Sequence, residues 1–166
     1  MFLLSLKFFT VDDDYIQHLK KTDTNVPDNY SSQKPFIGVL FNVNGLDYIA
    51  PLTSPKAKHS KIKNSSQTSF KVYEDNSNKV LLCIIQLNNM IPVKKSCISQ
   101  FDVTSLGLKY QFLLLKEINY IRTHQEKLMN KANKLYQLIT VKKIPALMSF
   151  SCDFLALETA CNDFHR

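Results

Sequence analysis

The sequence predicts an α+β fold, in which a mostly antiparallel sheet is packed with α-helices. Up to about residue 105, apolar residues alternate with polar ones or form short runs between turn residues, as in strands and hairpins. Beyond that point, apolar residues recur with the period of about 3.6 residues that is typical of amphipathic helices. The chain has 166 residues, the length of one ordinary domain, so we expect a single domain over 1–166.

The first expected elements are a strand and a helix. Residues 3–10 are apolar with polar side chains spaced two apart, and this pattern predicts a strand. Asp12-Asp13-Asp14 supplies an N-cap and negative charge where a helix would start, and apolar residues follow over 15–19. The aspartates could also be taken for a metal-binding cluster, but the helix start explains them better. Residues 22–32 are mostly polar and predict a long loop.

Two hairpins are expected next. Asn44-Gly45 joins two β-rich runs and is a strong hairpin signal, because both residues tolerate positive φ. A polar turn over 75–78 predicts the second hairpin, whose later strand is apolar enough to be central in the sheet. A short edge strand is expected after it. The predicted strands are 36–43, 46–52, 69–74, 79–87 and 90–94.

Three helices are expected in the C-terminal third. The first has one apolar face, formed by Tyr110, Leu113, Leu114, Ile118 and Ile121. Thr123-x-x-Glu126 resembles a capping box and predicts that a second helix starts there after a bend and ends before Pro145. Its inward residues are Leu128, Ala132, Leu135 and Ile139. A final amphipathic helix is predicted from Phe150, Phe154, Leu157, Cys161 and Phe164.

Composition excludes some binding sites and favours others. The three glycines, Gly38, Gly45 and Gly107, stand alone, so neither a dinucleotide fingerprint nor a phosphate-binding glycine loop can form. Lys and Arg number 21 against 14 Asp and Glu, which gives a net charge of +7. This excess favours a polyanionic partner, nucleic acid ahead of an anionic membrane, although a basic protein without such a partner has the same charge.

The cysteines and the N-terminus bear on the cellular compartment. The four cysteines are scattered without a Cys-x-x-Cys pair, and we expect them to be buried free thiols. The apolar run over 1–6 is too short for a signal peptide or a membrane span. We therefore expect a cytoplasmic protein with no membrane partner.

Residues 48–73 contain no acidic side chain but carry five lysines, His59 and many hydroxyl groups. Lysines supply point charges for phosphates, while hydroxyls and loop amides supply directional hydrogen bonds. The stretch starts where a predicted strand ends and suits a phosphodiester site. A solvated linker between two hairpins explains the residues equally well. The lysines are Lys56, Lys58, Lys61, Lys63 and Lys71.

Protein-only cleavage of RNA needs such groups but no metal ion. The 2′-hydroxyl attacks the adjacent phosphorus, so the protein must accept a proton, stabilise negative charge and protonate the leaving 5′-oxygen. A lysine whose pKa is lowered by neighbouring cations can act as base or acid, and DNA would be inert. The histidines lack zinc-site spacing, and Ser54 lacks a nucleophile-elbow context, so zinc and Ser-His-Asp chemistry are disfavoured.

Several motifs resemble one known family. The three main motifs are Thr53-Ser54-Pro55-Lys56, Tyr30-x-x-x-Lys34-x-Phe36-Ile37-Gly38 and Tyr48-x-Ala50-Pro51-Leu52. The match extends in order over most of the chain through Lys7-Phe8-Phe9-Thr10, Asn89-Met90-Ile91-Pro92 and the helix from Tyr110 to Arg122. Together these motifs are similar to the ToxN/AbiQ group of type III toxin–antitoxin endoribonucleases.

The resemblance implies a curved antiparallel sheet, a partial barrel like that of the MazF/Kid toxins. It also implies sequence-selective RNA cleavage with no metal or other cofactor, leaving a 2′,3′-cyclic phosphate and a 5′-hydroxyl. The expected partners are cellular or phage RNA substrates and a repetitive antitoxin RNA, which the toxin cuts into inhibitory pseudoknots. The resemblance further implies closed rings of alternating protein and RNA, and a role in aborting phage infection.

The resemblance assigns roles to five residues of the catalytic site. Thr53, Ser54 and Lys56 would form the loop that holds the phosphate. Ser54 would supply an essential hydroxyl, and Lys56 would stabilise charge or transfer a proton. Lys34 would face this loop, and Tyr30 would position a base or phosphate. An ordinary exposed lysine is the plainer explanation of Lys34.

Five further residues are expected to bind RNA: Tyr15, Lys58, His59, Lys61 and Lys63. For Tyr15, a ring that anchors the first helix is the favoured alternative. Three departures from the family pattern stand out. Lys58 replaces an aromatic residue of some relatives, residues 22–32 differ in length and composition, and residues 1–6 would lengthen the first strand.

Two other functions fit the same residues. A non-catalytic RNA-binding regulatory module would use the basic loop only to hold RNA, with affinity that falls steeply with salt. A protein-interaction domain would leave the basic loop solvated. Intact RNA after incubation would favour the first alternative, and failure to bind RNA would favour the second.

Overall fold

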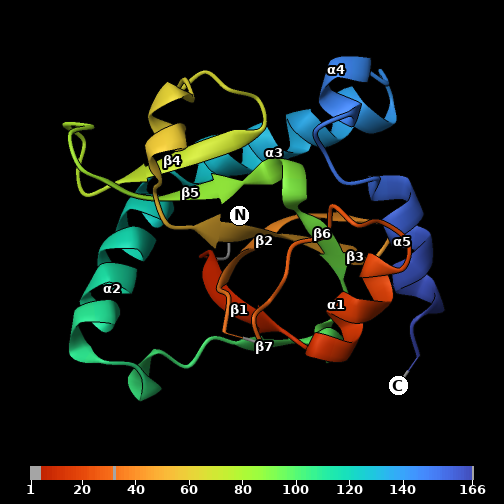
Figure 1. Ribbon diagram of the computed structural model, residues 1–166, viewed down its shortest axis with the longest axis horizontal. Helices are drawn as coiled ribbons and strands as arrows, with labels where there is room; N and C mark the ends of the chain where they lie inside the picture. The colour runs from red at the N-terminus through yellow and green to blue at the C-terminus, as the bar shows by residue number, and fades with distance from the viewer. Residues whose placement is uncertain (1–4, 32, 166) are drawn as a thin grey trace.

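The computed structural model describes residues 5–31 and 33–165 (Figure 1). Its strands are β1 (Lys7–Val11), β2 (Phe36–Val43), β3 (Leu46–Thr53), β4 (Ser69–Tyr73), β5 (Leu81–Gln86), β6 (Ile91–Val93) and β7 (Ile98–Gln100). Its helices are α1 (Asp13–Lys20), α2 (Leu108–Thr123), α3 (Gln125–Thr140), α4 (Pro145–Met148) and α5 (Phe154–Asp163).

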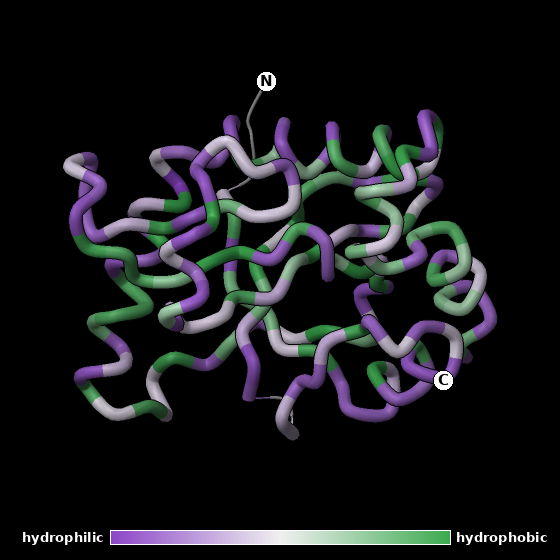
Figure 2. Tube along the Cα trace, turned by 45° about the horizontal axis from the view of Figure 1, so that its top comes forward, coloured by the Kyte–Doolittle hydropathy of each residue, from purple (hydrophilic) through white to green (hydrophobic). Residues whose placement is uncertain are grey.

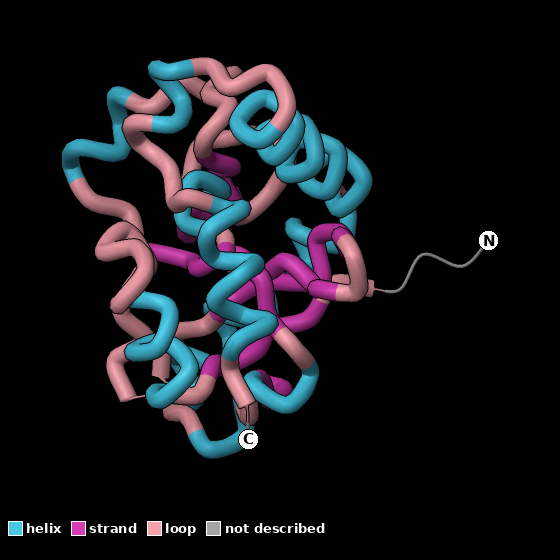
Figure 3. Tube along the Cα trace, turned by 90° about the vertical axis from the view of Figure 1, so that its right-hand side faces the viewer, coloured by secondary structure: helices cyan, strands magenta, loops and turns pink. Residues whose placement is uncertain are grey.

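The described strands form one sheet in which every pairing is antiparallel. The strand order is β4-β5-β3-β2-β1-β7, and β6 pairs with β3 beside this path. Figure 3 shows the strands in the middle of the molecule with helices around them. The predicted α+β class with a mostly antiparallel sheet is therefore confirmed, and the likeness to MazF and Kid stays a prediction.

Both predicted hairpins are present. In the first, Asn44 and Gly45 have φ values of 52° and 83°, as the turn requires. The strands close with Val43 opposite Leu46, and Asn42 Nδ2 donates to Asp47 Oδ1 at 2.8 Å. The second hairpin pairs β4 with β5, and β5 lies inside the sheet between β4 and β3. The predicted short strand after it is β6.

The first and last parts of the sheet differ from the prediction. Residues 3 and 4 lie outside the described residues, while Ser5 and Leu6 precede the strand and do not lengthen it. β1 begins at Lys7, where its pairing with Gly38 of β2 begins. The sequence interpretation missed β7, because this strand is three residues long and two of them are polar.

The bend between the two long helices is confirmed, but the capping box is wrong. Thr123 is the last residue of α2, and its Oγ1 donates to the carbonyl of Asn119 at 2.8 Å. His124 forms the junction instead, with its backbone N–H on the carbonyls of Tyr120 and Ile121. Thr123 thus closes the helix that it belongs to, so it is not the cap of the next one.

The C-terminal helix is shorter than predicted. Pro145 begins the short α4, which is a favoured place for proline because its missing N–H is not needed there. Phe150 is exposed in the turn that follows, so it takes no part in the helix. α5 starts at Phe154, where Asp153 Oδ1 accepts the backbone N–H of Ala156 at 3.2 Å, and it ends before Phe164.

One hydrophobic cluster runs through the described part of the chain. It joins sheet residues such as Ile49 and Ile85 to Ile121, Leu135 and Leu157 from the three longest helices of the C-terminal third. Figure 2 shows hydrophobic segments mostly inside the fold and hydrophilic segments mostly in outer loops. This continuous core supports our proposal of a single domain over 1–166. All four cysteines are buried and free, as predicted.

A buried polar cluster lies inside this core. Glu158 Oε2 accepts hydrogen bonds from the hydroxyls of Tyr48 and Tyr136, at 2.6 and 2.7 Å. Tyr48 therefore has a structural role within its motif, because its ring is fully buried and its hydroxyl is paired. Within residues 5–31 and 33–165, no helix combines the length and apolarity needed to cross a membrane.

Candidate active site

A cavity of about 400 Å³ opens where β3 ends against α2. In Figure 1, β3 points toward α2, and the loop after it turns away along the top of the molecule. The loop before β2 and strand β5 complete the wall. Its lining includes all five residues expected at the catalytic site: Tyr30, Lys34, Thr53, Ser54 and Lys56.

The loop after β3 carries three of these residues. Thr53 ends the strand and is held opposite Ile84 of β5, so the loop starts from a fixed point in the sheet. Ser54 and Lys56 are exposed. Two hydrogen bonds shape the loop: the backbone N–H of Lys56 donates to His59 Nδ1, and that of His59 to the Lys56 carbonyl, both at 2.8 Å.

His59 is buried and supports the loop from within. Its side chain is only 5 % exposed, although RNA binding was expected of it. Burial lowers the pKa of His59, and the charges of Lys58, Lys56 and Lys71 lower it further. The imidazole therefore stays neutral at physiological pH, which its role as hydrogen-bond acceptor requires.

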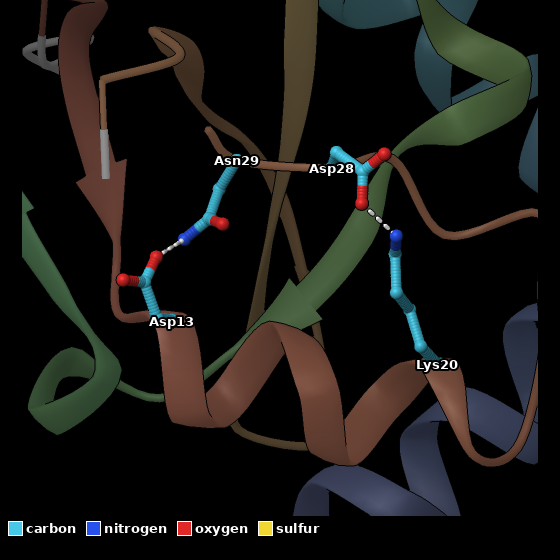
Figure 4. Close-up of polar contacts among 4 residues, drawn as sticks. All are labelled: Asp13, Lys20, Asp28 and Asn29. Atoms are coloured by element: carbon cyan, nitrogen blue, oxygen red, sulfur yellow. Dashed lines mark hydrogen bonds and ion pairs between the residues drawn. The ribbon is translucent and has the colours of Figure 1, made fainter. Parts of the chain in front are cut away.

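The loop before β2 carries Tyr30 and Lys34 and is tied to the start of α1. The buried Asn29 donates through Nδ2 to the carbonyl of Val11 at 2.8 Å. The same Nδ2 donates to Asp13 Oδ1 at 2.6 Å (Figure 4). Its own carbonyl accepts the backbone N–H of Lys34 at 3.0 Å. The sequence interpretation missed Asn29, because a single asparagine in a polar loop carries no signal.

A second tie holds the same loop. Lys20, the last residue of α1, forms an ion pair with Asp28, which Figure 4 shows beside the Asn29–Asp13 contact. Both ties join α1 to the residues just before Tyr30. The helix predicted from Asp12-Asp13-Asp14 therefore acts as a support for one side of the cavity.

Lys34 and Lys56 line the cavity from two different loops. Burial lowers the pKa of Lys34, and the positive charge of Lys56 lowers it further. Lys34 Nζ also lies 5.7 Å from the centre of the Tyr30 ring, within cation–π range. The half-buried Lys34 is thus more than an ordinary exposed lysine, because it shares a site with a second cation.

The wall formed by α2 was not foreseen. Tyr110, Leu113 and Glu117 line the cavity from this helix, and Cys83 lines it from β5. Glu117 is only 4 % exposed. Burial raises the pKa of Glu117, and a hydrogen bond from the Cys83 thiol lowers it by less. The resulting pKa is about 7. A signal existed, since Glu117 interrupts the predicted apolar face next to Ile118.

Tyr15 does not reach the cavity. Its side chain is fully buried, its hydroxyl donates to the carbonyl of Pro92 at 2.5 Å, and its ring packs 5.1 Å from that of Phe164. The expected RNA contact therefore gives way to the alternative, a ring that anchors the first helix. Lys58, Lys61 and Lys63 are exposed in the segment after the cavity loop, and their contact with RNA stays a prediction.

The aspartates lie at the start of α1, with Asp13 and Asp14 in its first turn, but the side chain of the N-cap residue Asp12 makes no capping hydrogen bond. The helix begins at Asp13, the backbone N–H of Tyr15 donates to Asp14 Oδ1 at 2.8 Å, and Asp13 accepts from Asn29. Among the described residues, no three side chains of His, Cys, Asp or Glu are grouped as a metal site requires.

The cavity can bind and polarise a phosphodiester. Lys34 and Lys56 supply positive charge, and the hydroxyls of Thr53 and Ser54 supply directional donors. Lys34, with its lowered pKa, is suited to release a proton, and the Glu117 carboxyl is suited to take one. These are the groups that cleavage by an internal hydroxyl needs.

Comparisons with known proteins agree with this geometry. Residues 7–162 match the model of the family described as toxin ToxN of the type III toxin–antitoxin system. The chain is 34 % identical to the endoribonuclease ToxN of Pectobacterium atrosepticum, with 97 % of this chain and 95 % of the relative covered. It is 29 % identical to the endoribonuclease AbiQ of Lactococcus lactis subsp. lactis, with 93 % and 87 % covered.

Two solved structures are similar over nearly the whole chain. One comes from work on a processed non-coding RNA that regulates a bacterial antiviral system; it gives a TM-score of 0.87 at 33 % identity, covering 96 % of this chain and 99 % of its own. The other is that of AbiQ, a lactococcal anti-phage endoribonuclease; it gives 0.87 at 29 % identity, covering 96 % and 97 %. The chain therefore belongs to the ToxN family of type III toxin–antitoxin toxins.

Proposed function

We propose that this toxin is an endoribonuclease that cuts RNA without a metal ion, by attack of a 2′-hydroxyl on the adjacent phosphorus. The products are a 2′,3′-cyclic phosphate and a 5′-hydroxyl. The observation that carries the proposal is the cavity. It brings together Tyr30 and Lys34, from the loop before β2, and Thr53, Ser54 and Lys56, from the end of β3 and the loop after it. Its relatives are named endoribonucleases.

Each of these side chains has a part in the reaction. Ser54 and Thr53 donate hydrogen bonds to the non-bridging phosphate oxygens, where negative charge grows in the transition state. Lys56 stabilises the same charge. Lys34 protonates the departing 5′-oxygen, which its lowered pKa favours. The exposed Tyr30 stacks on or orients the nucleotide beside the scissile bond.

The partners follow from the relatives. One solved relative was described as a toxin that is selectively inhibited by a non-coding RNA pseudoknot, at 34 % identity to this chain. We propose that this toxin likewise processes and is inhibited by a repeat pseudoknot RNA, in a closed protein–RNA ring. Its cytoplasmic targets are cellular or phage RNAs, and its biological role is abortive infection. The exposed Lys58, Lys61 and Lys63 lie beside the cavity loop, where they would contact RNA phosphates.

Two variants test the catalytic proposal. Ser54→Ala and Lys56→Ala should each lower the rate of RNA cleavage by roughly 100-fold or more and abolish toxicity on expression. Lys79→Ala, an exposed lysine in the β4–β5 turn, is the matched control and should cleave normally. RNA with hydrogen in place of the 2′-hydroxyl at the cut nucleotide should stay intact. Intact RNA with the wild-type toxin would point instead to a non-catalytic RNA-binding regulator.

A further inference from the structure

The cavity contains one carboxyl group among its described lining residues, and the roles above do not use it. Glu117 belongs to α2 and lines the same cavity as the two loops that carry the lysines and hydroxyls. The other ionisable side chains on the lining are hydrogen-bond donors in their protonated forms: Tyr30, Lys34, Lys56, Cys83 and Tyr110. The ionised carboxylate of Glu117 can accept a proton directly, whereas the other ionisable lining groups must first lose one.

The partners of Glu117 leave its carboxyl available. The buried Glu158 is a useful contrast, because its Oε2 is saturated by two tyrosine hydroxyls at 2.6 and 2.7 Å. Glu117 has the thiol of Cys83 as its hydrogen-bond partner, which is a weak donor. The ion pairs among the described residues are Lys20–Asp28 and Lys116–Glu74, so Glu117 is held in neither.

We propose that Glu117 is the general base of this site and accepts the proton of the attacking 2′-hydroxyl. The inference rests on the proposed function. In the step, the 2′-oxygen bonds to phosphorus as its proton moves to the Glu117 carboxylate. The bond between phosphorus and the 5′-oxygen breaks, and this oxygen takes a proton from the Lys34 ammonium. Proton exchange with water then restores both side chains.

The electrostatics of the cavity suit this role. Burial raises the pKa of Glu117 to about 7, so a large fraction is ionised at neutral pH while the group remains a better base than an ordinary carboxylate. Lys34 and Lys56 face it from the two loops, Cys83 from β5 and Tyr110 from its own helix. The pKa of Glu117 is set by burial, which raises it, and by the Cys83 hydrogen bond, which lowers it.

The first experiment compares Glu117→Gln with wild type. Gln has the same shape but cannot take a proton at neutral pH. The cut site is mapped first by sequencing 5′-hydroxyl ends in total bacterial RNA treated with the wild-type toxin, and a short synthetic RNA with this site is then used. We expect Glu117→Gln to cleave this RNA at a rate at least roughly 100-fold below that of the wild type. Thermal unfolding and binding of the 2′-deoxy RNA should be unchanged. Glu126→Gln, at an exposed position of α3, is the matched control.

The second experiment separates a base from an acid. A substrate with sulfur in place of the bridging 5′-oxygen has a leaving group that needs no protonation. We expect Glu117→Gln to remain slow on this RNA, whereas Lys34→Gln should recover. The acid limb of the wild-type pH–rate profile should also vanish in Glu117→Gln. In Cys83→Val the midpoint of the acid limb should move to higher pH. The thiol hydrogen bond lowers the pKa of Glu117 in the wild type, so its loss should raise this pKa.

The outcomes separate the two proposals. A wild-type toxin that cuts no RNA overturns the proposed function and this inference with it. A wild-type toxin that cuts, with Glu117→Gln equally fast or rescued by the sulfur substrate, overturns the general-base role alone. An acid limb that persists in Glu117→Gln, or does not move in Cys83→Val, also overturns it, since the limb would then belong to another group.

Discussion

The backbone N–H of Lys56 donates to the imidazole Nδ1 of His59 at 2.8 Å, so a neutral histidine beneath the surface shapes the loop that presents the lysine. Protonation of Nδ1 would remove this acceptor. Lys56 and the loop around it are therefore coupled to the protonation state of a residue that does not line the cavity.

The contribution of His59 to stability should depend on pH. Burial, followed by nearby lysine charges, lowers the pKa of folded His59 below its ordinary value of 6.5. As the pH falls below 6.5, the unfolded chain binds the proton first, and stability falls until the folded pKa is passed. Urea unfolding should show this loss as a fall in the stability of the wild type relative to His59→Asn, whose side-chain oxygen can accept the same bond. The comparison cancels groups that titrate in both proteins, such as Glu117, whose raised pKa acts in the opposite direction. Equal pH dependence in both proteins would contradict the assignment.

Removal of the acceptor should cost stability and activity. We expect His59→Ala to lower the free energy of unfolding by about 1–2 kcal/mol, because the part-buried hydrogen bond from the Lys56 backbone N–H is lost. RNA cleavage should fall with it, while His59→Asn should retain most of both. Cleavage that survives in His59→Ala would show that the loop keeps its shape without this bond.

Substitution of Asn29 should lower both the stability of the fold and the rate of RNA cleavage. Asn29→Ala removes the bonds to Val11 and Asp13 at 2.8 and 2.6 Å, and we expect the free energy of unfolding to fall. The loss should be about 1–3 kcal/mol. Cleavage should also fall, because Tyr30 and Lys34 lose their support. Asn25→Ala, in the same loop but exposed, is the control. An Asn29→Ala variant that is as stable and as active as the wild type would refute the anchoring role.

The pKa of Lys34 should depend on the charge of Lys56. Since the charge of Lys56 lowers the pKa of Lys34, Lys56→Gln should raise it. NMR titration of isotope-labelled lysine side chains measures this directly. Lys58→Gln, which changes the neighbouring exposed lysine, should leave the Lys34 titration nearly in place. Identical Lys34 titrations in wild type and Lys56→Gln would mean that the two ammonium groups lie too far apart to share one phosphate.

The buried Glu158 should be structural. Glu158→Ala leaves the hydroxyls of Tyr48 and Tyr136 without an acceptor in the core, and we expect it to destabilise the fold by about 2–5 kcal/mol. Below the melting temperature, RNA cleavage should change little. Glu126→Ala on the exposed side of α3 should alter stability by less than about 0.5 kcal/mol. Urea unfolding of the three proteins checks the comparison.

The sequence predicted most of the helices and strands and part of the site. Turn chemistry at Asn44-Gly45 predicted the first hairpin, and the change to helical periodicity predicted the long helices, because both signals are local in the chain. The motifs around Lys34 and Ser54 led to the family and to the five residues that line the cavity. Local signals near element ends were weaker, and Thr123 was assigned to the wrong helix.

Only the tertiary structure decided which polar residues face the cavity and which support it. Tyr15 and His59 were expected to bind RNA but are buried, and Glu117 and Asn29 were unforeseen. The physical reason is that burial and pKa depend on packing between distant segments. α2 brings Glu117 against loops from the first third of the chain, and no local pattern records that approach.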